Sequence, residues 1–261
     1  MSTVIFIHGM FVTYRSWDGW ADRFKQRGHA CEVPHWPGRD ATPAELRARH
    51  PDPAVGRLSL GDLLAYYEAI VRAQKEPPIL VGHSMGGLIV QLLINRGLGA
   101  RGVAIDSAPP KGVLSLRWSF LRSNWAILNP FVSKNAPLLL SENQFRYAFA
   151  HTLPPERVHA IYQQAVVPES RVVGRAALSD VARIDWQKPH APLLFVTGGK
   201  DHIIPASLNR TNAGKYKDAA SRVDVKDFDG RTHYTILDGE GWTEVADAVA
   251  DWIGAAWSSR V

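Results

Sequence analysis

The chain has 261 residues, of which 46% are hydrophobic and 21% charged, and its formal net charge is +5. This length allows one large α/β domain with a sizeable core, or such a core with an inserted cap. The basic residues are scattered and form no stripe interleaved with aromatics, which argues against a nucleic-acid partner. No window reaches the roughly 18 uncharged apolar residues that cross a bilayer, so no membrane insertion is expected.

The first eight residues contain no basic stretch, and their apolar run is too short for a secretory leader. Cys31 is the only cysteine, so the chain cannot form an intramolecular disulfide. Both observations favour a cytoplasmic protein. The oligomeric state has no signal in the sequence.

Short apolar runs alternate with longer helical patterns along most of the chain. This alternation is typical of a mainly parallel sheet with helices on both faces. The predicted strands are 3–8, 29–34, 78–82, 102–106, 192–198 and 222–228, and the predicted helices are 16–27, 59–74, 84–96, 205–217 and 240–257. Ser59 followed by Asp62 signals a helix start, as does Pro205 in a first-turn position.

The alternation stops between residues 107 and 190. This segment is rich in aromatics and prolines, has helical patterns at 116–128 and 142–151, and lacks a convincing buried strand. Because it lies between two predicted strands, we expect a helical cap over 107–190, inserted into an α/β core made of 1–106 and 191–261.

The most informative motif is Gly82-His83-Ser84-Met85-Gly86-Gly87, which contains the pattern G-x-S-x-G. An apolar strand pattern precedes it and a long apolar helix pattern follows it. A serine on such a strand-to-helix turn adopts a strained backbone conformation that exposes its hydroxyl, and glycines on either side allow close packing. Ser84 is therefore the candidate nucleophile.

A serine hydroxyl needs a base within hydrogen-bonding reach, usually a histidine, and that histidine needs an acid on its other nitrogen. In a parallel sheet such groups collect at the carboxyl ends of the strands. Asp201 follows the predicted strand 192–198, and His233 follows the last predicted strand. The chain order Ser84, Asp201, His233 is the order that α/β-hydrolases use.

On these three loops the chain resembles the carboxylesterase and lipase-like α/β-hydrolases, over nearly its whole length and least in the cap. The resemblance implies that His8-Gly9-Met10-Phe11 is the oxyanion loop, with the backbone N–H groups of Met10 and Met85 as donors. Phe11 is the rival for the first donor. Since the first strand begins almost at Met1, the resemblance also implies a sheet of about six strands, trimmed at its N-terminal side.

Other polar residues near these loops have alternative interpretations. Asp106 also ends a strand, and a minority of the family takes its acid there; the glycine pair before Asp201 favours Asp201. His202 is adjacent to Asp201 and cannot form the relay, so a structural or rim position is expected for it. His8 and His83 are expected to be structural, and no metal-ligand spacing is present, so neither a metal nor a cofactor is expected.

A cap above the serine has to form one wall of the substrate pocket. The candidate pocket residues are all aromatic: Phe11, Trp36, Trp118, Phe120 and Trp125. Each of the cap aromatics could equally pack the cap onto the sheet. Arg117 and Arg122 could recognise an acidic substrate group or could be solvated surface charges.

These features predict a serine hydrolase that cleaves a small uncharged ester or lactone through an acyl-enzyme. The same triad would also serve a perhydrolase or an amidase. Dehalogenases and epoxide hydrolases of this fold carry aspartate at the elbow, and plant-type hydroxynitrile lyases carry a lysine after the catalytic histidine, where this chain has Tyr234. A small-molecule receptor that uses the pocket without turnover is the alternative from another class.

Overall fold

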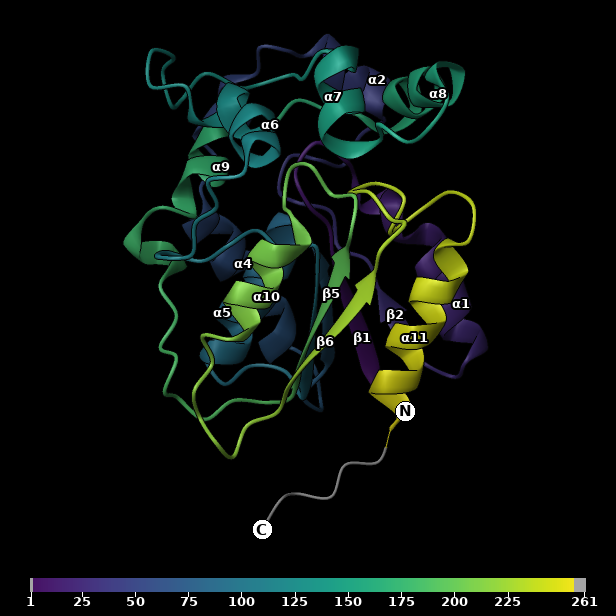
Figure 1. Ribbon diagram of the computed structural model, residues 1–261, viewed down its shortest axis with the longest axis vertical. Helices are drawn as coiled ribbons and strands as arrows, with labels where there is room; N and C mark the ends of the chain where they lie inside the picture. Colours follow the sequence, from purple (N-terminus) through teal and green to yellow (C-terminus); the bar gives the residue numbers. More distant parts are fainter. Residues whose placement is uncertain (1, 256–261) are drawn as a thin grey trace.

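The computed structural model describes residues 2–255 and is built on a six-stranded sheet in which every neighbouring pair of strands is parallel (Figure 1). The strand order is β2-β1-β3-β4-β5-β6. The strands are β1 (Thr3–Ile7), β2 (Ala30–Glu32), β3 (Ile79–His83), β4 (Arg101–Ile105), β5 (Leu193–Gly198) and β6 (Val223–Phe228). The predicted fold class and strand number are thereby confirmed.

Helices cover both faces of the sheet, because alternate residues of its inner strands are apolar on each side. On β1, Val4 and Phe6 belong to one buried cluster, while Ile5 and Ile7 belong to the other. The first face is covered by α1 (Asp18–Gln26) and α11 (Trp242–Gly254), and the second by α4 (Leu60–Arg72), α5 (Met85–Asn95) and α10 (Ala206–Ala213). No described helix is long and apolar enough to span a membrane.

The predicted helix starts differ from the observed ones by at most two residues. Ser59 caps α4 in a reciprocal pair of hydrogen bonds with Asp62, as predicted. Pro205 is the residue before α10 rather than its first turn. The last predicted helix begins at Trp242, and its predicted end at Trp257 lies outside the described residues.

Segment 107–190 contributes no strand to the sheet and lies above the carboxyl ends of the strands (Figure 1). Its helices are α6 (Trp118–Leu128), α7 (Glu142–Phe149), α8 (Pro155–Ala165), α9 (Arg171–Ala176) and the 3₁₀ turn η2 (Asp180–Ala182). The sequence predicts α6 and α7 but misses α8 and α9, as well as the short helices α2 (Pro43–Ala48) and α3 (Pro53–Arg57) and the 3₁₀ turn η1 (Tyr14–Trp17).

Helix α2 belongs to the first half of the chain but packs beside α8. The Arg47 guanidinium donates hydrogen bonds to the carbonyl oxygens of Tyr162, Gln163 and Val166, at and just beyond the end of α8. A cation at a helix C-terminus is favourable because the last carbonyls lack partners within the helix. The helical layer above the sheet thus includes residues 43–48 in addition to 107–190.

The start of α5 lies directly against the sheet, and this approach requires glycine. A Cβ at Gly86 would overlap the carbonyl group of Ile7, and one at Gly82 would overlap the carbonyl group of Gly86. Both obstacles are backbone atoms, which cannot move aside as a flexible side chain does.

We predict that Gly86→Ala lowers the free energy of unfolding by about 3 kcal/mol, because the new methyl group has to displace β1 or α5. Gly61→Ala is the matched control. Gly61 is exposed in the first turn of α4 with only the Ser59 hydroxyl oxygen nearby, at 3.5 Å. Alanine there should stabilise the protein by about 0.5–1 kcal/mol. Denaturant unfolding measures both changes, and equal effects of the two substitutions would contradict the packing argument.

Candidate active site

Ser84 lies at the turn between β3 and α5, with backbone angles φ 58° and ψ −120°. This conformation is strained for a residue with a side chain and is held by its surroundings. Its N–H donates to the carbonyl of Ile105 at 2.9 Å, and its carbonyl accepts the N–H of Ala108 at 2.9 Å. The residues that end β4 therefore hold the turn in place, and the serine side chain remains 8% exposed.

Asp201 and His233 lie in the loops after β5 and β6 and are in contact. Asp201 Oδ2 and His233 Nδ1 are 2.5 Å apart, and both side chains are fully buried. The other carboxylate oxygen of Asp201 accepts the backbone N–H groups of Ile203 and Ile204 at 2.8 and 2.7 Å. These two hydrogen bonds fix the orientation of the carboxylate toward the imidazole.

The second nitrogen of His233, Nε2, is buried and has no hydrogen-bond partner among the described residues. A buried imidazole nitrogen without a partner is free to accept a proton from a hydroxyl. No hydrogen bond joins it to Ser84, whose hydroxyl makes no side-chain hydrogen bond within the described part of the chain. In enzymes that use a serine and a histidine together, the hydrogen bond between them is often loose before substrate binds and tightens in the reacting complex.

The loop after β1 passes close to the serine. A Cβ at Gly9 would lie 2.7 Å from Ser84 Cβ, so only glycine fits there. His8 secures this loop: its Nδ1 lies 2.9 Å from the Gly9 carbonyl oxygen, and its Nε2 accepts the N–H of Trp36 at 3.3 Å. Burial lowers the pKa of His8 from 6.5 to about 3, so the ring is neutral and can accept that bond.

The backbone N–H groups of Met10 and Met85 have no hydrogen-bond partner within residues 2–255. The N–H of Met85 is one of the free donors at the start of α5. Burial raises the pKa of Glu169, and the nearby charge of Arg39 and the backbone of Phe11 are among the influences that lower it. Met10 stays the predicted first donor, with Phe11 as its rival.

The family model for the alpha/beta hydrolase family matches residues 4–251. The chain belongs to this family. No sequence among the curated proteins matches the chain.

Solved structures share the fold of this hydrolase at low sequence identity. Monoacylglycerol lipase from Paleococcus ferrophilus is 18% identical with a TM-score of 0.69, over 96% of this chain and 93% of that one. Polyneuridine aldehyde esterase is 15% identical with a TM-score of 0.67, over 97% and 99%. An extracellular α/β-hydrolase from a Paenibacillus species is 19% identical with a TM-score of 0.66, over 97% and 98%.

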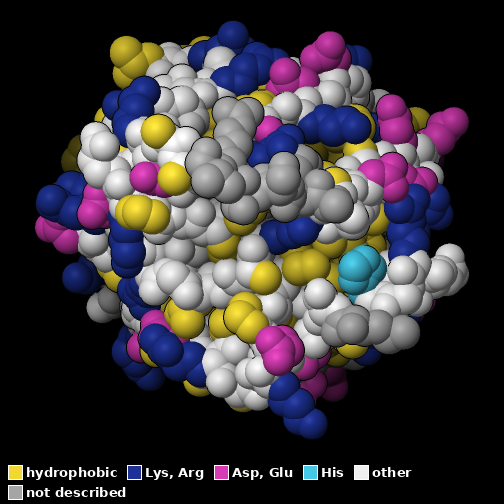
Figure 2. All heavy atoms as spheres, turned by 90° about the horizontal axis from the view of Figure 1, so that it is seen from below, with side chains coloured by type: hydrophobic (Ala, Val, Ile, Leu, Met, Phe, Trp, Pro, Cys, Tyr) yellow, Lys and Arg dark blue, Asp and Glu magenta, His cyan; other side chains and the backbone are white. Residues whose placement is uncertain are grey.

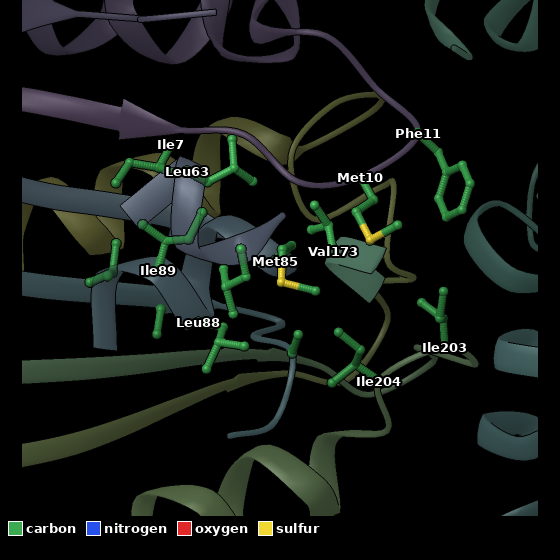
Figure 3. Packing of buried hydrophobic residues seen from close by; sticks show 14 of the residues in the cluster. Ile7, Met10, Phe11, Leu63, Met85, Leu88, Ile89, Val173, Ile203 and Ile204 are labelled. Carbon is green, nitrogen blue, oxygen red and sulfur yellow. The ribbon is translucent and has the colours of Figure 1, made fainter. Parts of the chain in front are cut away.

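Ser84 lines a cavity of about 320 Å³ whose other walls are nearly all apolar. Met10 and Met85 converge on the space that Phe11, Ile203 and Ile204 border (Figure 3). The remaining lining residues come mainly from segment 107–190: Ala108, Pro109, Val113, Leu114, Ser115, Leu116, Phe120, Leu121, Asn124, Ile127, Leu128, Phe149, Gly174, Ala177 and Leu178. No charged side chain is among the lining residues, so the cavity suits an uncharged molecule.

Two of the five predicted pocket aromatics, Phe11 and Phe120, line this cavity, and the other three do not. Trp36 is fully buried and stacks on His8, with 4.6 Å between ring centroids. Trp118 and Trp125 are on the outer face of α6, 72% and 57% exposed. The sequence analysis missed Phe149 and the leucines that line the cavity. Helix α6 is apolar on several faces, so its periodicity does not reveal which face points toward the cavity.

His202 and His83 each lie against another histidine. His202 Nδ1 lies 2.9 Å from the Tyr147 carbonyl oxygen, and its ring stacks on His151. His83 is buried behind the serine turn with its ring centroid 4.4 Å from that of His233. Burial lowers the pKa of His83 well below 6.5, and the nearby His233 lowers it further, so His83 is neutral.

Asp106 is a second buried acid in the site. Its Oδ1 accepts the N–H of Gly198 at 2.7 Å. A carboxylate oxygen of Asp106 and one ring nitrogen each of His83 and His233 lie within 4.8 Å of one another. Burial raises the pKa of Asp106 well above its ordinary value, and the charge and hydrogen bonding of Asp201 raise it further. Burial therefore favours the neutral form of Asp106.

Burial also raises the pKa of Asp201, whereas its hydrogen bonds from Ile204, Asp106 and Ile203 lower it. Burial thus raises the pKa of both carboxyls, and the two backbone donors on Asp201 favour its charged form more than the single donor on Asp106 does.

We predict that Asp106→Asn changes the free energy of unfolding by less than about 1 kcal/mol, because an amide can replace a neutral acid as both donor and acceptor. Asp201→Asn should lower the free energy of unfolding more. The NH₂ of the new amide would face either the Nδ1–H of His233 or a backbone N–H, and both of these are donors. Denaturant unfolding at neutral pH compares the two variants. If Asp106→Asn were as destabilising as Asp201→Asn, Asp106 would not be the neutral member.

Proposed function

We propose that the chain is a serine hydrolase of carboxylic esters, with Ser84 as nucleophile, His233 as base and Asp201 as the acid that orients it. The single observation that carries this proposal is the buried Asp201–His233 contact of 2.5 Å, which leaves His233 Nε2 without a partner. Ser84 stands in its strained turn at the same edge of the sheet. The similar solved structures include a monoacylglycerol lipase and an esterase, which agrees with this chemistry.

The proposed reaction begins when Ser84 Oγ attacks the ester carbonyl and His233 Nε2 accepts its proton. Asp201 holds the Nδ1–H tautomer and stabilises the imidazolium that forms. The N–H groups of Met10 and Met85 bind the oxyanion, each donor contributing about 10²–10³ in rate in comparable enzymes. His233 then protonates the leaving alcohol, and a water activated by the same histidine releases the acid and regenerates Ser84.

An uncharged ester or lactone is the proposed substrate class, because the cavity presents apolar side chains and no charge. Segment 107–190 serves as the cap that forms most of this cavity, over a core of 1–106 and 191–261. Perhydrolase and amidase activities would use the same residues. The cytoplasm is the proposed compartment.

We predict that Ser84→Ala lowers kcat for p-nitrophenyl butyrate by about 10⁴–10⁶ and abolishes labelling by a fluorophosphonate probe, because no other group can form the acyl-enzyme. Ser133→Ala is the matched control, since Ser133 lies in an exposed loop of the cap and does not line the cavity. Equal trace activity in the wild type and Ser84→Ala, with neither labelled, would favour a small-molecule receptor that uses the cavity without turnover.

The pH dependence offers a separate test. Burial lowers the pKa of His233 from 6.5 to about 3. A base works only when neutral, so a lower pKa keeps the enzyme active to lower pH. We expect kcat/KM to stay nearly constant from about pH 8 to pH 5, measured with circular dichroism to verify folding at each pH. A fall with its midpoint near pH 6.5 would instead show that the charge of Asp201, 2.5 Å from Nδ1, offsets the effect of burial on the His233 pKa.

A further inference from the structure

Exposed large hydrophobic side chains gather on one part of the molecule. Of the eight in the described chain, seven lie between residues 114 and 178, and the eighth, Val225, is on the edge strand β6. The seven are Leu114, Leu116, Trp118, Leu121, Trp125, Phe131 and Leu178. Isolated exposed leucines are ordinary, but such a concentration marks an interaction surface.

Four of these side chains, Leu114, Leu116, Leu121 and Leu178, also line the cavity that contains Ser84. They form its mouth, and Leu116 is 89% exposed. The exposed surface is therefore continuous with the candidate active site.

Helix α6 extends this surface beyond the mouth. Its inner face carries Phe120 and Ile127, which are buried and line the cavity. Trp118, Leu121 and Trp125 follow one another at spacings of three and four residues, so they share the outer face. A helix that is apolar on both faces is normally covered on both. We call the six residues Leu114, Leu116, Trp118, Leu121, Trp125 and Leu178 the mouth patch.

The segment that holds five of the six mouth-patch residues carries charge of one sign, whereas Asp180 lies two residues beyond the sixth, Leu178. Residues 107–140 contain four cations, Lys111, Arg117, Arg122 and Lys134, and no Asp or Glu. Lys111 pairs with Asp180 at 2.8 Å, whereas Arg117, Arg122 and Lys134 form no ion pair with any described residue. The opposite end of the molecule, seen in Figure 2, carries side chains of both signs around its edge.

We propose that the mouth patch docks on an anionic lipid surface, from which a lipophilic ester enters the cavity. Exposed tryptophans and leucines beside arginines are the composition that binds at the boundary of headgroups and acyl chains. Anionic headgroups complement the unpaired cations. A second copy of the chain is a poorer occupant, because a twofold contact would bring the same cations together. The delivery of substrate, though not the docking itself, rests on the proposed esterase function.

Vesicle co-sedimentation tests the docking with Ser84→Ala protein, so the result does not depend on catalysis. We expect binding to phosphatidylcholine vesicles that contain about 30% phosphatidylglycerol, and much weaker binding to pure phosphatidylcholine. Arg117→Gln and Arg122→Gln should each weaken binding about fivefold at low salt, whereas Lys75→Gln, at the other end of the sheet, should not. The double variant Trp118→Gln/Trp125→Gln should weaken binding at least about tenfold, and Val225→Gln is its control.

Hydrolysis measured in parallel separates the two proposals. The tryptophan double variant should hydrolyse soluble p-nitrophenyl butyrate as the wild type does, but should lose the faster hydrolysis of a long-chain p-nitrophenyl ester held in anionic vesicles. Wild-type hydrolysis of p-nitrophenyl butyrate without vesicle binding would overturn the docking proposal alone. Light scattering that shows a dimer, which the tryptophan variant dissociates, would overturn it in favour of a second copy.

Discussion

The close approach of α5 to β1 is the constraint on which the candidate site depends. Because Gly86 has no side chain, the first turn of α5 rests on the carbonyl of Ile7, and Ser84 is left at the turn with a positive φ. Hydrogen bonds to Ile105 and Ala108 then hold the serine from the β4 side. Three neighbouring strands thus set the position of one hydroxyl, and the loops after β5 and β6 need only bring Asp201 and His233 to the same edge.

Much of this arrangement could be predicted from the sequence because it follows from local pattern and topology. Apolar runs of five or six residues identify the strands, and a parallel sheet collects their following loops at one edge. The positions of individual side chains in segment 107–190 could not be predicted in the same way. Helix α6 carries apolar residues on more than one face, so its pattern does not separate Phe120, which lines the cavity, from Trp118, which is exposed. The raised pKa of Asp106 likewise arises from its burial and from the charge of Asp201, 95 positions along the chain, and no local pattern records either.

The charges of the site follow from its burial. Desolvation lowers the pKa values of His8, His83 and His233 and raises those of Asp106 and Asp201, while two backbone N–H groups favour the charged form of Asp201. A single anion beside a neutral imidazole is the starting state that proton transfer from a hydroxyl requires. The apolar cavity adds to this effect, because electrostatic interactions strengthen where water is excluded.

One buried ion pair ties the helical layer to the sheet. Arg39, in the loop after β2, and Glu169, just before α9, lie 2.8 Å apart and are almost completely buried. The Glu169 carboxylate also meets the Phe11 backbone, and the Phe11 carbonyl accepts the N–H of Val167 at 3.0 Å. Removing either charge would leave the other buried without a partner, which is far less favourable than the loss of a surface ion pair. Segment 107–190 therefore cannot be exchanged between relatives on its own. A chimera that receives this segment from another member of the family also needs the matching loop around Arg39.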